Sequence, residues 1–163
     1  MSGIQIDSSF YLGSHLLYVT SKSLFENISV DKGLYCNACQ IFMSNTYQTW
    51  RLHKFNKKEI EETQKYLDYF DIRLCSHAPY TLSLAKSFDQ SKQMRNRLAD
   101  KVKKLSQLKA NDWSPPIVFH PGSPGKGSTQ EEKIRALSNV CSNLSGIYGE
   151  LLEKICIEPA AGE

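Results

Sequence analysis

The chain has 163 residues, 40% of them hydrophobic, which is enough to bury one sizeable core. Its net charge of +3, from 20 basic and 17 acidic residues, is too small an excess to indicate nucleic-acid binding by itself. No apolar run approaches about 18 residues and residues 1–9 are polar, so we expect neither a membrane span nor a signal peptide.

The five cysteines are odd in number and irregularly spaced, which favours reduced, mostly buried thiols in an intracellular protein. The nucleus and the cytoplasm both remain open. Cys36 and Cys39 have the spacing of a zinc knuckle or redox pair, but without a second pair we expect neither role.

The N-terminal third is expected to begin with a loose extension over residues 1–10. A first short strand follows over residues 11–15. Ser21 is placed to cap a helix that runs to about residue 30, with apolar side chains on one face. A second strand is expected over residues 38–42, before a polar and aromatic loop.

The middle of the chain predicts two amphipathic helices around a third strand over residues 73–77. The first helix starts at Asn56 with a signal close to a capping box, and its inward residues would be Ile60, Leu67 and Phe70. The second covers residues 88–109, with apolar residues every three or four positions: Met94, Leu98, Val102, Leu105 and Leu108. Its opposite face is basic and is expected to be solvated: Lys92, Arg95, Arg97, Lys101, Lys103 and Lys104.

The last third begins with a fourth strand over residues 117–120 and a loop rich in proline and glycine over residues 121–127. Ser128 and Glu131 have capping-box spacing, and Gly146 would end the helix that they begin. A fifth strand leads to residue 158. The helix is expected to bury Ile134, Leu137, Val140, Cys141 and Leu144.

Strands and helices therefore alternate along the chain, which favours a parallel sheet with right-handed crossovers. A complete eight-fold barrel needs about 250 residues. The predicted fold class is an α/β parallel barrel of the TIM type, incomplete, with about five strands and four helices over residues 11–163.

Three of the expected strands end on a potential metal ligand, namely His77, His120 and Glu158. The carboxyl ends of barrel strands face one shared site, and two histidines with one carboxylate match a catalytic zinc site that keeps a position open for water. Zinc would lower the pKa of that water to about 7, which yields hydroxide at neutral pH. His15 ends another strand and could face the same cavity, whereas His53 lies in a loop and is read as exposed.

At these residues the chain resembles the endonuclease IV family of zinc-dependent apurinic/apyrimidinic endonucleases, over the N-terminal part of the family's xylose-isomerase-like TIM barrel. The most specific pieces are Ser76-His-Ala-Pro-Tyr80 and Phe119-His-Pro-Gly-Ser123, in this order. The weaker pieces are Gly13-Ser-His15, Gln40-Ile-Phe42 with Asn45 and Trp50, and Ile157-Glu158 with Ala161 and Gly162.

The resemblance implies cleavage of double-stranded DNA on the 5′ side of an abasic site, with up to three zinc ions. It makes His77 and His120 ligands of one zinc, and Glu158 a catalytic carboxylate that bridges two. It also places Tyr80, Tyr47 and Gln48 in loops that contact DNA, where an aromatic ring can stack on an unpaired base.

The sequence departs from the family pattern at several points. The family's second-loop arginine is not obvious, because Thr46, Tyr47 and Gln48 stand in that region. Pro124 replaces a second histidine, and Pro159 and Ala160 replace an Asn-Thr pair. The family's later ligands would follow residue 163. We therefore expect about one bound zinc and weak activity alone, with a second polypeptide or self-association completing the barrel.

Two alternatives remain open. A sugar isomerase or epimerase on a related barrel would use similar ligands, although protruding aromatic loops favour DNA. A non-catalytic fragment that needs a complementary half would instead leave two unpaired strand edges.

Overall fold

The computed structural model describes residues 11–16, 23, 25–26, 37–43, 55–147 and 149–159, with only the backbone described at residue 14. Several expectations lie outside these residues: the N-terminal extension, the cap at Ser21, Cys36 of the CxxC pair, and Tyr47, Gln48 and His53 of the aromatic loop.

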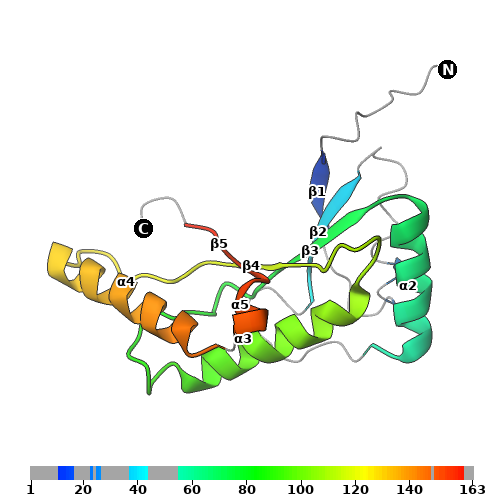
Figure 1. The fold of residues 1–163 in the computed structure, drawn as a ribbon. Helices are drawn as coiled ribbons and strands as arrows, with labels where there is room; N and C mark the ends of the chain where they lie inside the picture. The colour runs from blue at the N-terminus through cyan, green and yellow to red at the C-terminus, as the bar shows by residue number, and fades with distance from the viewer. Residues whose placement is uncertain are drawn as a thin grey trace.

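Five parallel strands form one sheet, in the order in which they occur along the chain (Figure 1). Sequential order means that every crossover steps to the same side, and right-handed crossovers then place all the helices on one face of the sheet. This is the arrangement of a TIM barrel opened after its fifth strand, so the predicted fold class is confirmed. The strands are β1 (Gly13–Leu16), β2 (Ala38–Phe42), β3 (Arg73–His77), β4 (Ile117–Phe119) and β5 (Ile155–Ile157).

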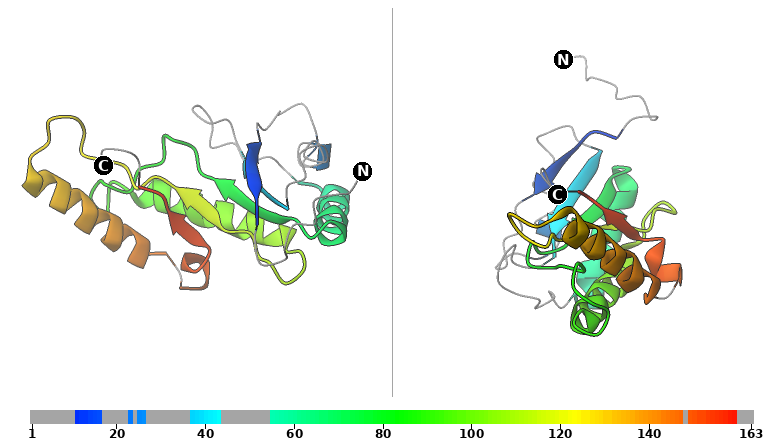
Figure 2. Two further views of the ribbon diagram at one scale, coloured as in Figure 1. Left: turned by 90° about the horizontal axis from the view of Figure 1, so that it is seen from above. Right: turned by 90° about the vertical axis from the view of Figure 1, so that its left-hand side faces the viewer.

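Helices connect the strands, and Figures 1 and 2 show α3 running along the sheet with α2 near one of its ends and α4 extending past β4 at the other. The helix predicted over 88–109 is shorter, because a turn precedes it and a 3₁₀ turn ends it. A short helix after Gly149 was not predicted. The bounds are α2 (Lys57–Tyr69), α3 (Lys92–Leu105), η2 (Ser106–Leu108), α4 (Gln130–Ser145) and α5 (Gly149–Leu152).

The core lies between the sheet and the helices. Alternate strand residues such as Ile41, Leu74 and Phe119 are fully buried against it, as strand geometry requires. The apolar stripe predicted for α3 is confirmed, since its helical part lies in this core together with Leu108 of η2. On the other sheet face Cys75 is half-buried and Cys156 is exposed, whereas Phe42 and His77 at the strand ends are buried.

Two helix starts follow their sequence signals closely. Asn56 and Glu59 form the predicted capping box of α2, with reciprocal side chain to backbone hydrogen bonds. At α4 the box forms one residue later than predicted, between Thr129 and Glu132. The pairs Ser128–Glu131 and Thr129–Glu132 both have the spacing of a capping box. Ser128 does not cap the helix, because its hydroxyl donates to the carbonyl of Gly125.

The prediction that the basic face of α3 is solvated is wrong at Arg95 and Lys101. Lys101 is only 1% exposed and Arg95 only 7%. The reason is that α3 is covered on a second side, where both α4 and α5 contact it. The spacing of the apolar residues predicted one buried face of α3. It could not predict the second buried face, which carries Arg95 and Lys101.

A buried polar network holds α4 in this position. Arg95 donates to the carbonyl of Phe88 and to the side chain of Asn143 on α4. Asn143 in turn donates to the carbonyls of Leu84 and Lys86, at 2.8 and 2.9 Å. These bonds tie α3, α4 and the segment between β3 and α3 together.

Several residues expected in the core are exposed instead. Ile134 and Leu137 of α4 are 59% and 63% exposed, and Cys141 is also exposed. The structure therefore corrects the expected burial, because α4 contacts α3 through Asn143 and its neighbours rather than along its most apolar face. Phe70, expected inside, caps the end of α2 and is 42% exposed.

Two general expectations can be compared with the described residues. No helix among them is long and apolar enough to cross a bilayer. Of the four cysteines in this part of the chain, Cys39 is buried and Cys75 half-buried, but Cys141 and Cys156 are exposed, so the expectation of mostly buried thiols is only half right.

We predict that Asn143→Ala lowers the free energy of unfolding by about 3 kcal/mol, because it removes the bonds that Asn143 makes to the buried Arg95 and to two backbone carbonyls. Urea unfolding measures the change. The matched control is Ser142→Ala at the exposed neighbouring position, which should cost less than about 0.5 kcal/mol. Equal stability of the two variants would contradict a supporting role for the network.

Stability should rise when the solution is made alkaline. Burial, with a smaller contribution from Lys104, lowers the pKa of Lys101 from 10.5 to about 8. Between these values the folded chain has lost the proton that the unfolded chain keeps, so unfolding takes up a proton and stability increases with pH. The rise totals roughly 3 kcal/mol for a shift of this size.

Unfolding free energies measured from pH 7 to pH 11 test this expectation. Lys101→Met should remove the rise and should be more stable than the parent at pH 7, because no ammonium group is then buried. Lys103→Met, at an exposed position two residues away, should keep the rise. Parallel curves for the parent and Lys101→Met would disprove the argument.

Candidate metal centre

Three adjacent strands deliver one potential ligand each to the same edge of the sheet. His77 is the last residue of β3, His120 follows β4 directly, and Glu158 follows β5 directly. In the parallel register His77 lies opposite Val118 and Phe119 lies opposite Ile157. The strand ends are therefore level, and the amide of Glu158 donates to the carbonyl of Phe119 at 3.0 Å, which extends the ladder beyond β5.

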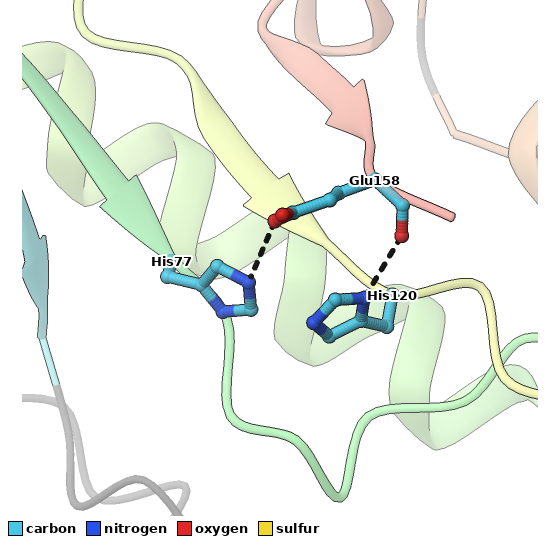
Figure 3. Close-up of side chains that lie close together, drawn as sticks. All are labelled: His77, His120 and Glu158. Carbon is cyan, nitrogen blue, oxygen red and sulfur yellow. Dashed lines mark hydrogen bonds and ion pairs between the residues drawn. The ribbon is translucent and has the colours of Figure 1, made fainter. Parts of the chain in front are cut away.

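The side chains of these three residues converge, as Figure 3 shows. One ligand atom from each lies within 4.8 Å of the others, and His77 Nε2 is 3.3 Å from Glu158 Oε2. Two ligands bound to one tetrahedral zinc at about 2.0–2.1 Å are about 3.3 Å apart, so this pair already has the separation that a shared ion requires. Any pair of ligand atoms as far apart as 4.8 Å would have to move closer, by a side-chain movement, before both could bind one ion.

Backbone carbonyls fix which nitrogen of each imidazole carries the proton. His77 Nδ1 lies 2.6 Å from the carbonyl oxygen of Ala78, and His120 Nδ1 lies 2.8 Å from that of Glu158. A carbonyl can only accept, so Nδ1 is the donor in both rings. In the neutral rings both Nε2 atoms then present a lone pair, which is the arrangement that metal-binding histidines use.

The contact between His77 and Glu158 is favourable only if a positive charge lies on the imidazole ring or between the two side chains. Neutral His77 directs a lone pair at a carboxylate oxygen only 3.3 Å away, and two acceptors at this distance repel. A proton on Nε2 or a shared cation removes the repulsion. The donor set of two nitrogens and one carboxylate oxygen is one that zinc accepts.

The surroundings distinguish these ligands from a nearby thiol. Cys75 lies two residues before His77 on the same strand face, but burial, together with Cys156, raises its pKa to about 11. It therefore remains a thiol at neutral pH and is a poor metal ligand, since only the thiolate binds well. Glu158 is exposed, which leaves the centre open on one side.

A layer of aromatic rings supports the two histidines. The Phe42 ring lies 5.0 Å from His77, 4.7 Å from His15 and 5.4 Å from Tyr80. Tyr80 in turn stacks on His120, with ring centroids 5.6 Å apart. Contacts on several sides hold the imidazoles in fixed orientations.

His15 borders the centre but is not among the three converging ligands. Its ring is 6.2 Å from that of His77. Burial and the neighbouring His77 lower its pKa, against an opposing influence of Glu158. His15 is therefore mostly neutral at pH 7, and its main contact is the Phe42 ring.

Sequence reasoning located the three converging residues, whereas Tyr47, Gln48 and His53 lie outside the described residues. It missed the role of Phe42 in packing against the histidines. A signal was available, because Phe42 ends a strand and pairs in register with His77. Tyr80 lies beside the centre and is 43% exposed.

Comparison with known proteins gives matches among solved structures alone. No protein-family model matches the chain, and no curated protein sequence does. Endonuclease IV from Thermus thermophilus is similar over 94% of this chain and 53% of its own length, with 21% identity and a TM-score of 0.65.

Two further solved structures are similar at lower identity. SacUVDE matches 82% of this chain and 46% of its own length, with 14% identity and a TM-score of 0.58. AsfvAP:AG matches 91% of this chain and 47% of its own length, with 11% identity and a TM-score of 0.58. The chain thus spans about half the length of these structures, and at such identities the likeness establishes a shared barrel fold.

We predict that Glu158→Gln lowers zinc affinity by at least about a hundredfold, because loss of even an outer-shell partner typically costs 10- to 100-fold. His120→Ala should act similarly. The measurement is a competition titration with a chromogenic zinc chelator, together with the metal content of purified protein. Glu153→Gln, an exposed carboxylate five residues away, is the matched control and should bind zinc as the parent does. Undiminished affinity in Glu158→Gln would exclude this centre.

Proposed function

We propose that the protein is a DNA-repair phosphodiesterase of the endonuclease IV type, which hydrolyses the backbone on the 5′ side of an abasic site with zinc as its cofactor. The observation that carries the proposal is the convergence of His77, His120 and Glu158, with the Nδ1 atom of each histidine on a backbone carbonyl and 3.3 Å between His77 Nε2 and Glu158 Oε2.

The fold neighbours support this choice of reaction. Endonuclease IV from Thermus thermophilus is a nuclease by name, and it is similar to this chain over almost the whole chain. The match covers the strands whose carboxyl ends carry the candidate ligands. A shared fold supports a function only together with the chemistry of the site, which here is suited to a metal.

Each residue of the centre would have its own role in binding zinc and in the reaction. His77 and His120 would hold zinc through Nε2 while the carbonyls of Ala78 and Glu158 orient their rings. Glu158 would bind through one carboxylate oxygen and leave the other for a second metal or for the proton of the attacking water. Zinc, when bound, supplies an acidified water and a charge that offsets the one developing on the phosphate.

Aromatic loops would contact the DNA. Tyr80 presents a half-exposed ring directly beside His120, where it can pack against a sugar or base next to the cleaved bond. Tyr47 and Gln48, which the resemblance places in a loop that contacts DNA, lie outside the described residues.

The number of metal ions would limit the rate. Among the described residues His77, His120 and Glu158 form the single group able to hold a metal, so we expect about one zinc per chain. With one ion, the attacking and leaving oxygens would not both be stabilised as in paired-metal enzymes. We therefore propose weak activity for this chain alone, and a second polypeptide or self-association as the route to a complete barrel.

Cleavage of an end-labelled duplex with one abasic site tests the function. The zinc-loaded chain should cut slowly on the 5′ side, and mass spectrometry of the fragments identifies the bond. Glu158→Gln should slow cleavage by more than about a hundredfold, consistent with the sensitivity of metal sites. Glu153→Gln should cleave like the parent.

Three outcomes would contradict the proposal in different ways. Cleavage that survives Glu158→Gln would point to a contaminating nuclease. Rapid cleavage by the pure chain would show that further metals are dispensable. Conversion of free sugars without DNA cleavage would favour the isomerase alternative.

A further inference from the structure

A groove of about 910 Å³ lies beside the candidate metal centre, between α4 and the loop over residues 121–127, with β5 at one end. We call it the α4 groove. In both views of Figure 2 the loop runs beside α4, and the chain turns back at the start of the helix. The volume is in the range of small-molecule sites, which are typically about 300–1,000 Å³.

The wall formed by the loop is held in place at its base. Leu84 donates its amide to the carbonyl of Pro121 at 3.0 Å. Gly122 has a φ of +86°, and a Cβ there would lie 2.1 Å from the Ser83 hydroxyl oxygen. Only glycine allows this close approach, so the base of the loop packs against the segment after β3.

The opposite wall, on α4, is held by the buried network of Arg95 and Asn143. Most of the residues that α4 turns into the groove are apolar, and two of them, Ile134 and Leu137, are mostly exposed. Ile157 adds a third exposed apolar side chain at the end of β5. Exposed apolar surface gathered in one hollow is a common mark of a binding site.

The charges of the groove have one sign. Lys126 on the loop and Lys133 on α4 line it, and no acidic residue is among its lining residues in the described part of the chain. An occupant should therefore combine a flat or compact apolar part with negative charge. A nucleotide has this combination, because its base can cover the apolar wall while its phosphate lies near the lysines.

The groove also lies next to the metal centre along the chain. Pro121 and Pro159 line it, and they follow His120 and Glu158 in the chain. A strand whose phosphate lay at the metal centre would thus reach the α4 groove with its neighbouring nucleotide. This continuity favours a nucleic acid strand over an unrelated small molecule.

We propose that the α4 groove binds a nucleotide of the strand that passes through the metal centre, with its base against Ile134, Leu137 and Ile157 and its phosphates near Lys126 and Lys133. The inference rests on the proposed function for its substrate class. The α4 groove would then contact a nucleotide next to the cleaved bond, whatever the base of that nucleotide is.

Fluorescence anisotropy with a fluorescein-labelled ten-residue oligothymidylate tests the groove, in zinc and again in EDTA. Leu137→Asp should weaken binding by about tenfold or more, because it places a carboxylate against the strand. Lys126→Ala combined with Lys133→Ala should weaken it by about tenfold and lower the slope of log affinity against log salt by about 2.

Matched controls come from α2, outside the groove. Lys58→Ala removes a well-exposed lysine, and Tyr69→Asp places a charge on an exposed ring position. Both should bind the oligonucleotide within about twofold of the parent, since surface changes away from a contact have small effects. Circular dichroism confirms that each variant is folded.

The outcomes separate this inference from the proposed function. Groove-dependent binding without cleavage of abasic DNA would support the inference and count against the function. Cleavage with unchanged binding in the groove variants would overturn the inference alone, as would a parent that binds no oligonucleotide. A change of mass in light scattering for Leu137→Asp, with binding intact, would mean that a second copy covers the groove, and would also overturn it.

Discussion

The parallel pairing of β3, β4 and β5 is the constraint on which the candidate site depends. Because the strands run the same way and their ends are level, residues 77, 120 and 158 meet although they are far apart in the chain. The ladder continues beyond β5, because the amide of Glu158 donates to the carbonyl of Phe119 and the ring of His120 lies against the carbonyl of Glu158. Slippage of one residue would turn these side chains to the opposite face.

Support for the centre comes from polar and aromatic packing on different sides. Phe42 and Tyr80 hold the imidazole rings, while backbone carbonyls fix their tautomers. Further away, Arg95 and Asn143 hold α4 against α3 and thereby set one wall of the groove. A buried arginine and a buried lysine on one helix cost stability, since burial removes charged groups from water. The network offsets part of that cost by fixing where α4 lies.

Much of this could be predicted from residue order. Alternating strands and helices indicated the barrel, and the strand bounds differ from expectation by a residue or two. The three candidate ligands could be picked out because the carboxyl ends of parallel strands lie at one edge of the sheet. The frame of the α4 capping box was not decided by the sequence, because Ser128 and Thr129 both fit and only the loop conformation selects Thr129.

The sequence by itself determined the parallel architecture, the helix periods and which three residues converge at the strand ends, because these depend on local spacing and chain direction. Tertiary structure decided which helix faces are buried. Arg95 and Lys101 lie inside because α4 and α5 cover α3, and Ile134 and Leu137 lie outside because α4 meets its neighbours through Asn143. A helical period reveals that a face is apolar, but contact with a distant segment decides whether that face, or a charged one, is removed from water.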